Sequence, residues 1–207
     1  SVTVNILNAL ASMPDCRLVY FSSSYVYSGL AVRQNYDESS PLAPQHNFGI
    51  AKSFFEQFIL KIHPNAVIFR LCSVFGPGQA AHPNTILTFA KECLENNSLT
   101  VWGKGDRKLQ YIYMKDVVNV VLKSFDSVAG IYNLGGDDYI SVKDTATDIA
   151  KFFNVKVTFL ENKPEGETLP FLSNQKIKDN LRGDLFTPFS VALNEYLKSL
   201  IHEKTNL

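Results

Sequence analysis

The sequence predicts an α/β protein with a mainly parallel sheet, and three observations lead to this class. Two short stretches, 17–24 and 65–76, are almost continuously apolar, which is typical of strands that a parallel sheet buries on both faces. Segments with helical periodicity alternate with strand-like segments along the chain. The 207 residues are 45% hydrophobic, which is enough apolar material for one good-sized domain or one and a half small ones.

The first part of the chain is expected to form two helices and two strands. Apolar residues recur at helical spacing near the start and again after a loop rich in Asp, Ser and Pro, and both patterns indicate amphipathic helices. The expected elements are a helix that ends before Pro14, a strand at 17–24, a helix at 48–62 and a strand at 65–76. Gly76-Pro77-Gly78 is expected to end the second strand.

The remaining part alternates between helix and strand patterns. Ser141 precedes an amphipathic run with Asp144 at the third helical position, which is the pattern of a helix N-cap. The expected helices are 85–96, 115–126, 141–153, 173–181 and 190–201, and the expected strands are 99–103, 109–114, 130–135 and 155–160.

Composition and charge exclude several classes of function. Lys plus Arg equals Asp plus Glu at 20 each, so the basic excess of a nucleic-acid-binding protein is missing. Three widely spaced cysteines without a CxxC motif predict neither a zinc site nor a disulfide framework. No apolar run reaches the ~20 residues of a membrane span, and the first residues lack the pattern of a signal peptide. We therefore expect a cytoplasmic protein with no metal, no nucleic-acid partner and no membrane contact.

Several short motifs follow one another in a specific order, although each of them is weak alone. They are FSSSYVYSG (21–29), FGIAKSFFE (48–56), RLCSVFGPG (70–78), GKGDRKLQYIYMKDV (103–117), IYNLGG (131–136) and KPEGE (163–167). In this order they resemble the extended short-chain dehydrogenases/reductases, specifically the NAD-dependent nucleotide-sugar epimerases and dehydratases. The resemblance covers essentially the whole chain.

The resemblance implies a fold and a division of the chain. It implies part of a Rossmann-like parallel sheet, the C-terminal half of a cofactor domain, together with a smaller α/β substrate lobe. Residues 1–76 and 111–135 would be the remainder of the NAD(P)-binding domain. Residues 77–110 and 136–207 would form the lobe that binds a nucleotide sugar.

The resemblance also assigns the catalytic positions. In the family a tyrosine hydroxyl exchanges a proton with the substrate while NAD(P) takes or gives a hydride. A lysine four residues later lies on the same helix face, lowers the pKa of the tyrosine and binds the nicotinamide ribose. Here the lysine is Lys52, the assisting serine is Ser23, and Phe48 occupies the position of the tyrosine. Lys52 and Leu71 are the positions assigned to the cofactor.

Phe48 cannot exchange a proton, and three interpretations of it are open. The chain is a natural pseudoenzyme or uses an altered mechanism, or it carries an engineered Tyr-to-Phe change made to trap a complex. In the third interpretation Tyr25, Tyr27 or His46 provides a relocated acid or base; Tyr27 has packing as its alternative role. Loss of such a group typically lowers a rate ~10²–10⁴-fold.

On the substrate side the resemblance implies three contacts. Ser73 would touch the sugar or the diphosphate, Trp102 would pack against the nucleobase, and Arg107 would bind the diphosphate. Two of them have an ordinary alternative: Trp102 could be a core aromatic and Arg107 a surface charge. Many relatives have the diphosphate-binding arginine either at the position of Arg107 or at that of Leu109, and because residue 109 is not an arginine the diphosphate assignment is weakened.

Two charged residues are expected to be structural. Arg70 ends a buried strand and should pair with an acid inside the fold, because an unpaired buried charge is costly. Asp116 is expected to cap the helix that follows it.

The dinucleotide fingerprint of the family, Gly-x-x-Gly-x-x-Gly, does not occur in this sequence. We therefore expect that the N-terminal third of the family fold is missing, so that the chain is a fragment or receives that part from another chain. The complete protein would bind NAD or NADP, and this chain alone would bind it poorly or not at all. The expected function is that of a sugar-nucleotide epimerase, dehydratase or reductase, impaired here; the alternative is a catalytically silent nucleotide-sugar-binding or regulatory module. A homodimer through helix 48–62 is expected because relatives commonly dimerise there.

Overall fold

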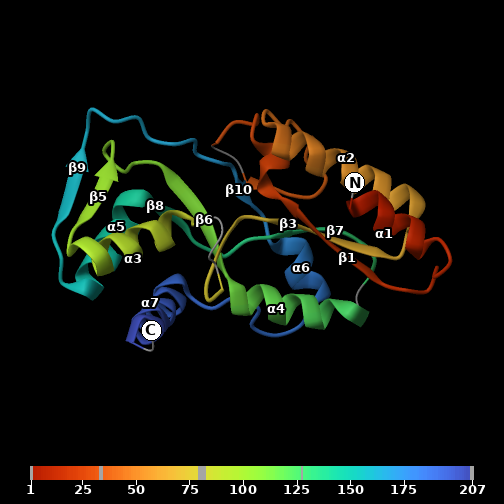
Figure 1. The fold of residues 1–207 in the computed structure, drawn as a ribbon. Helices are drawn as coiled ribbons and strands as arrows, with labels where there is room; N and C mark the ends of the chain where they lie inside the picture. The colour runs from red at the N-terminus through yellow and green to blue at the C-terminus, as the bar shows by residue number, and fades with distance from the viewer. Residues whose placement is uncertain (1, 33–34, 79–82, 127, 206–207) are drawn as a thin grey trace. The chain divides into compact units, whose positions relative to one another are not determined.

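The computed structural model describes residues 2–32, 35–78, 83–126 and 128–205, which divide by their contacts into two compact units. The first unit consists of Ser1–Cys72, Val117–Gly135 and Leu169–Leu185. The second unit consists of Ser73–Asp116, Gly136–Thr168 and Phe186–Leu207. In Figure 1 the chain is coloured by residue number, so that the segments of each unit can be followed.

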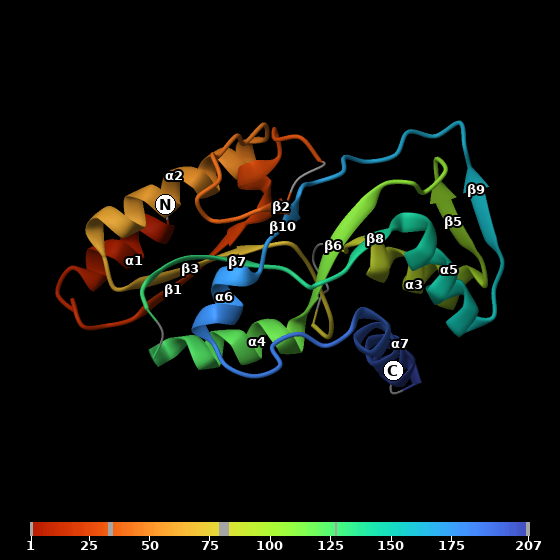
Figure 2. The same ribbon diagram turned by 180° about the vertical axis from the view of Figure 1, so that it is seen from behind.

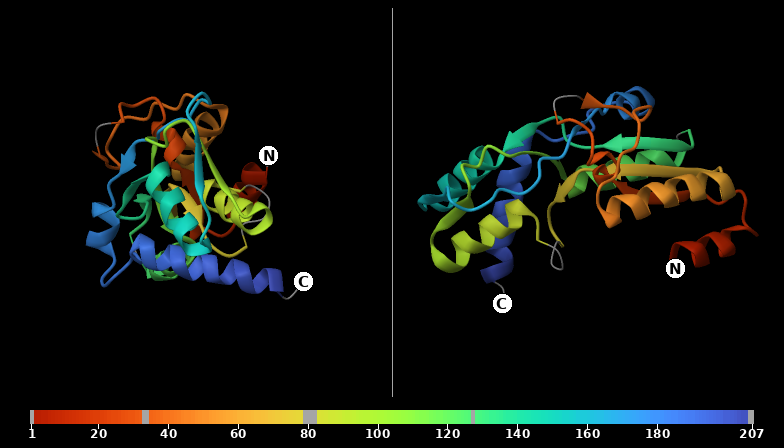
Figure 3. Two further views of the ribbon diagram at one scale, coloured as in Figure 1. Left: turned by 90° about the vertical axis from the view of Figure 1, so that its left-hand side faces the viewer. Right: turned by 90° about the horizontal axis from the view of Figure 1, so that it is seen from above.

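The first unit is built on a parallel sheet with the strand order β1-β3-β7. The strands are β1 (Leu18–Ser23), β3 (Ala66–Leu71) and β7 (Gly130–Leu134). Helices α1 (Val2–Leu10) and α2 (Asn47–Ile62) lie on one side of these strands, and α4 (Met114–Lys123) and α6 (Gln175–Asn180) lie on the other, as Figures 1 and 3 show. Leu7 of α1 and Ile59 of α2 pack on Ile68 of β3, so burial of apolar faces fixes both helices on the sheet.

The strand register places three polar residues side by side in the otherwise apolar sheet. Ser22 of β1 pairs with Arg70 of β3, and Arg70 pairs with Asn133 of β7. All three are buried. Because neighbours in register point to the same face of a sheet, this row presents its side chains together.

The second unit contains a mixed sheet, a strand pair and three helices. Strands β4 (Ser73–Phe75) and β6 (Lys108–Tyr113) are parallel, and β8 (Tyr139–Ser141) is antiparallel to β6. Strands β5 (Leu99–Trp102) and β9 (Val157–Leu160) form a separate parallel pair. Helices α3 (Thr85–Asn96), α5 (Val142–Phe153) and α7 (Phe189–Thr205) share one apolar core with these strands, and Figure 2 shows α3 and α5 beside β5.

Several expectations from the sequence are confirmed. The class is α/β with parallel sheets, and α3 has the expected bounds. The Ser141 side chain accepts a hydrogen bond from the backbone N–H of Asp144 at 3.0 Å, so the expected N-cap of α5 is present. No helix within the described ranges is long and apolar enough to cross a membrane.

Other expectations are wrong in detail. The apolar stretch 65–76 is two strands: the chain leaves the first sheet at Cys72, and β4 then joins another sheet with β6. No sequence pattern predicted β8 or the two-residue strands β2 (Asn35–Tyr36) and β10 (Phe171–Leu172), of which β2 and β10 pair with each other. The helix expected at 115–126 is α-helical only to Lys123 and continues as the 3₁₀ helix η2 (Ser124–Asp126).

The division of the chain also differs from the expected one. Residues 136–207 were expected to lie wholly in the smaller lobe, whereas Leu169–Leu185 belongs to the first unit. This segment joins the first unit because β10 pairs with β2 and the Asn174 amide bonds both backbone groups of Gly135.

Candidate functional site

The residues of the catalytic motifs come together at the ends of β1 and α2 in the first unit. Ser23 is the last residue of β1 and caps the 3₁₀ helix η1 (Ser24–Tyr27), where its Oγ accepts the N–H of Tyr25 at 3.3 Å. The Tyr25 ring contacts the Phe48 ring edge-to-face, with centroids 5.9 Å apart. A Cβ at Gly49 would overlap the Tyr25 carbonyl, so glycine there permits this close approach of α2 to η1.

Lys52 lies one turn after Phe48 on α2. Its Nζ donates a hydrogen bond to the Phe21 carbonyl at 2.6 Å and lies 5.5 Å from the centroid of the Phe48 ring and 4.9 Å from that of Tyr20. Burial lowers the pKa of Lys52 below its ordinary value, against the opposing effect of the Glu56 carboxylate. The ammonium group therefore lies where it would act on a hydroxyl at position 48.

Two adjacent serines at the end of β1 have different roles. The Ser22 hydroxyl donates a hydrogen bond to the buried Glu56 carboxylate, so its proton is already used within the fold. The Ser23 hydroxyl accepts from the backbone and keeps its own proton for a further acceptor. Successive strand residues point to opposite faces, which explains the separation. Ser22 is thus part of the buried network of Glu56, whereas the role of Ser23 in the site stays a prediction.

Arg70 is the centre of a buried polar network. Its guanidinium forms an ion pair with Glu56, with 2.7 Å between Nη2 and Oε2 and 3.0 Å between Nε and Oε1. The guanidinium also donates a hydrogen bond to the Tyr27 hydroxyl. That hydroxyl lies within hydrogen-bond distance, 3.2 Å, of Oδ1 of Asn133. The expectation that Arg70 pairs with a buried acid is confirmed, and the acid is Glu56.

The same network decides the role of Tyr27. Its side chain is fully buried, with 0% exposure, and its hydroxyl is enclosed by Arg70, Asn133 and the Asp37 carbonyl. Burial raises the pKa of Tyr27, against the lowering effect of Arg70. Packing therefore accounts for Tyr27, whereas the rings of Tyr25 and His46 lie close to the site, 5.5 Å apart.

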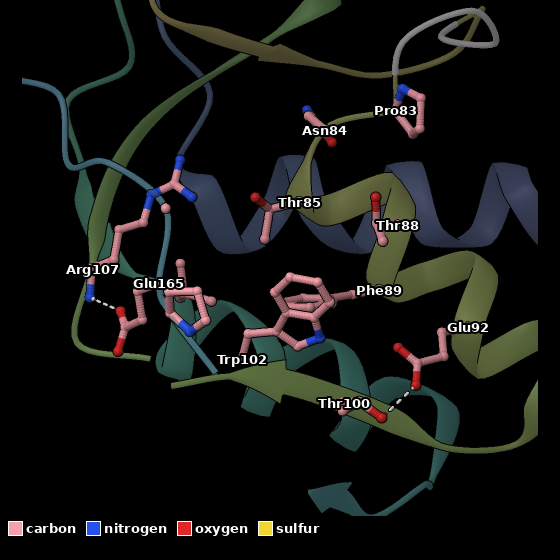
Figure 4. A pocket seen from close by; sticks show the side chains of 13 residues that line it. Pro83, Asn84, Thr85, Thr88, Phe89, Glu92, Thr100, Trp102, Arg107 and Glu165 are labelled. Carbon is pink, nitrogen blue, oxygen red and sulfur yellow. Dashed lines mark hydrogen bonds between the residues drawn. The ribbon is translucent and has the colours of Figure 1, made fainter. Parts of the chain in front are cut away.

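The second unit contains a cavity of about 630 Å³, and two of the residues expected to contact the substrate line it. Trp102 at the end of β5 and Arg107 before β6 both line it, as Figure 4 shows. The Trp102 side chain is 60% exposed, so the alternative of a core aromatic is wrong. Arg107 is half-buried, and its Nε has no hydrogen-bond partner among the described residues. An exposed aromatic face and a half-buried guanidinium are groups that could bind a base and a phosphate.

Sequence reasoning missed polar residues of this cavity. Thr100 donates its hydroxyl to Glu92 at 2.7 Å, and both residues line the cavity. Glu165 lines it too, with its carboxylate in the turn between β5 and β6. The motif KPEGE marked this segment, but its contact with a turn some sixty residues earlier has no signal in one sequence.

Three further assignments have clear positions. Leu71 pairs with Ser23 in the first sheet, so the structure places these two expected site residues side by side. Ser73 is the first residue of β4 and pairs with Tyr111; it is not among the described residues that line the cavity. The expectation for Asp116 is wrong: its carboxylate accepts bonds from the backbone and hydroxyl of Thr187, each at 2.8 Å, and so fixes the segment before α7.

The described residues contain no group of three or more His, Cys, Asp or Glu side chains that could hold a metal ion. Among the described residues, Lys52 is the cationic side chain placed beside Phe48, and Arg107 lines the cavity.

Comparison with known proteins gives the family. The family described as "NAD dependent epimerase/dehydratase family" matches residues 1–135. Among curated proteins, the chain is 27% identical over 175 residues to a trifunctional UDP-glucose 4,6-dehydratase/UDP-4-keto-6-deoxy-D-glucose 3,5-epimerase/UDP-4-keto-L-rhamnose-reductase of Arabidopsis thaliana, covering 78% of this chain and 26% of that protein. It is 28% identical to the dTDP-D-glucose 4,6-dehydratase of Mus musculus, covering 72% of this chain and 42% of that protein. The chain thus spans less than half the length of these relatives.

Solved structures show the same fold. The dTDP-glucose 4,6-dehydratase of Bacillus anthracis in complex with NAD superposes with a TM-score of 0.87 at 18% identity, covering 98% of this chain and 67% of that one. The UDP-glucose 4-epimerase of Thermotoga maritima with UDP-glucose gives 0.86 at 17% identity, covering 98% and 69%. A tyrosine-to-phenylalanine mutant of UDP-glucuronic acid 4-epimerase from Bacillus cereus, in complex with UDP-4-deoxy-4-fluoro-glucuronic acid and NAD, gives 0.82 at 23% identity, covering 96% and 67%.

Proposed function

The chain belongs to the NAD-dependent epimerase/dehydratase family, and we propose that it binds a nucleotide-diphosphate sugar and that its hydride-transfer chemistry is impaired. The observation that carries the proposal is the cavity of the second unit, where exposed Trp102 and half-buried Arg107 line one space. The observation that carries the impairment is Phe48, which stands beside Lys52 without a hydroxyl. The expected activity is that of an epimerase, dehydratase or reductase acting on a sugar ring carbon.

The cavity has the chemistry that a nucleotide-diphosphate sugar requires. The exposed indole face of Trp102 can stack on a nucleobase. The Arg107 guanidinium lines the cavity, and its terminal nitrogens can form paired hydrogen bonds with diphosphate oxygens. Relatives of the same fold were solved with UDP-glucose and with UDP-4-deoxy-4-fluoro-glucuronic acid, which supports this class of ligand.

The residues present fit one end of the cofactor. Lys52 has three N–H donors, of which one bonds the Phe21 carbonyl, so the others can bind ribose hydroxyls. Ser23 keeps a hydroxyl proton, and Leu71 lies next to it in the sheet. These residues would hold the nicotinamide end of NAD, which would supply the hydride acceptor and donor for the reaction. A Gly-x-x-Gly-x-x-Gly loop for its phosphates does not occur in these 207 residues, so we expect weak binding of NAD or NADP by this chain alone.

Because Phe48 has no hydroxyl, the group that gives and takes the substrate proton in the family is missing at this position. The residues that remain are the Ser23 hydroxyl, which can hold the substrate oxygen, and the Lys52 ammonium, which can stabilise negative charge. Tyr25, whose ring contacts Phe48, and His46, whose ring contacts that of Tyr25, are groups that could take over the proton. The second candidate function is therefore a catalytically silent nucleotide-sugar-binding or regulatory module, and the position of Phe48 favours it.

Binding of nucleotide sugars without NAD tests the proposal. We expect UDP-glucose, dTDP-glucose or GDP-mannose to raise the melting temperature of the chain, because a ligand that binds only the folded state stabilises it. A matched Arg107→Met variant should lose most of the shift, since it removes the phosphate-binding charge and keeps the apolar stem. A wild-type melting temperature unchanged by all three sugars, each in large excess, would refute the proposed binding.

A further inference from the structure

Glu165 makes an unusual set of contacts in the cavity wall. Its Oε1 accepts the backbone N–H groups of Lys104 at 2.9 Å, Gly105 at 2.8 Å and Asp106 at 3.3 Å. Its Oε2 accepts the N–H of Arg107 at 2.8 Å. Four consecutive amides of the turn between β5 and β6 thus converge on one carboxylate, and Figure 4 shows the bond to Arg107.

The turn is shaped to receive this side chain. Gly103 and Gly105 have φ angles of +73° and +75°, in the region that favours glycine, and this turns successive N–H groups inward. A Cβ at Gly103 would overlap the Glu165 side chain. Although desolvation raises it, the four backbone hydrogen bonds lower the pKa of Glu165 below its usual value, so the carboxylate is charged at neutral pH.

The segment that carries Glu165 is irregular, and its Lys163 ammonium lies 5.9 Å from the centroid of the Trp102 ring. After β9 ends at Leu160, residues 161–168 contain no helix or strand. Lys163 donates its N–H to the Leu160 carbonyl at 2.9 Å, which closes a local turn. The bonds of Glu165 therefore connect this segment to a part of the chain 58 to 61 residues earlier.

The same segment forms the surface on which Arg107 lies. Pro164, Glu165 and Gly166 line the cavity together with Trp102 and Arg107. A Cβ at Gly166 would overlap the Arg107 guanidinium, so the guanidinium lies directly against the backbone of Gly166. One residue away, Glu165 holds both the Arg107 N–H and the segment that contains Gly166.

We propose that Glu165 is a positioning residue: by occupying the four amides of the turn, it holds residues 161–168 against Arg107 and so orients the guanidinium for a diphosphate. This inference rests on the proposed binding of a nucleotide sugar and assigns to it a residue that touches no phosphate itself. The positioning effect depends on the charge of Glu165 as well as on its shape. A carboxylate can accept all four N–H donors, whereas the side-chain amide of a glutamine would turn its own N–H₂ group toward some of them.

The test compares Glu165→Gln with Glu161→Gln in the same 207-residue chain. The control removes the same charge from an exposed position at the start of the segment. Hydrogen exchange of the amides 104–107 should become faster in Glu165→Gln and stay unchanged in Glu161→Gln. The Kd for UDP-glucose should rise on the order of tenfold in Glu165→Gln only. A loss of affinity of this size corresponds to the energetic coupling between two contacting residues.

A double-mutant cycle with Arg107→Met separates positioning from a general effect on folding. If Glu165 acts through Arg107, Glu165→Gln adds no further loss of affinity once Arg107 is replaced. Additive losses, or an unchanged Kd despite faster exchange of the turn, would overturn the inference. The same comparison is made with dTDP-glucose or GDP-mannose if the wild-type chain binds one of these in place of UDP-glucose. Failure of the wild-type chain to bind any of the three would refute the proposed function and this inference with it, and that outcome is recognised before any variant is compared.

Discussion

At the scale of single residues, Phe48 and Lys52 lie together near the end of β1. The Lys52 Nζ is 5.5 Å from the centroid of the Phe48 ring, and the site proposed for Phe48, Lys52 and Ser23 stays a prediction. Phe48 is 55% exposed, so a hydroxyl added to its ring would be reached by solvent. The position is therefore suited to a direct chemical test.

We expect the phenol of a Phe48→Tyr variant to have a pKa below the ordinary value of ~10, because the nearby ammonium favours the phenolate. Burial raises the pKa of Tyr20, Tyr27 and Tyr132, so the new phenol should titrate before them. Tyrosinate absorbance as a function of pH, taken as the difference between variant and wild type, measures this. Adding Lys52→Met should restore the ordinary value; a phenol indifferent to Lys52 would contradict the proposed role of the lysine.

At the scale of elements, the buried ion pair between Glu56 and Arg70 connects helix α2 to strand β3. Both side chains are almost fully buried, at 1% and 3% exposure, so neither charge is compensated by water. Lys52 stands one turn before Glu56 on the same helix. The ion pair therefore helps to hold the helix that carries Phe48 and Lys52 in place on the sheet.

Glu56→Gln should lower the free energy of unfolding by about 3 kcal/mol, because it leaves the Arg70 guanidinium buried without a countercharge. Urea unfolding followed by circular dichroism measures the loss. Glu95→Gln removes the same charge from an exposed position on α3 and should change the stability by less than ~0.5 kcal/mol. Equal, small effects of both changes would show that Arg70 does not depend on Glu56.

Helices and long strands could be predicted from the sequence because their signals are local. The periodicity of 48–62 and the Ser141 cap determine α2 and the start of α5 within the chain segment itself. Strands β2 and β10 could not be predicted, since two residues carry no period and their pairing depends on a partner far along the chain. The break at Cys72 and the contact of Glu165 with the turn at 104–107 were missed for the same reason.

At the scale of the whole molecule, the exposed apolar residues of α2 bear on the proposed homodimer. Phe54 and Ile62 are 60% and 44% exposed, and Phe54 stacks on Phe58 at a centroid distance of 5.8 Å. Large exposed aromatics on one helix are typical of an interaction surface. We therefore keep a homodimer through this helix as a proposal.

Phe54→Glu should shift the chain from dimer to monomer, because it places a charge in the apolar contact. Sedimentation velocity at several concentrations measures the distribution. Val191→Glu makes the same change at a 55% exposed position on α7 and should leave the distribution unchanged. A wild-type chain that is monomeric at all concentrations would contradict the dimer.

The polar row across the first sheet has a consequence for how that sheet can assemble. Ser22, Arg70 and Asn133 stand opposite one another only in the native pairing. A slip of β3 by one residue would turn Arg70 toward the opposite face of the sheet and away from Glu56. A misaligned sheet would thus bury the Arg70 guanidinium without a countercharge. The free energy of such a sheet would be higher than that of the native one, so the polar row specifies the register of three otherwise apolar strands.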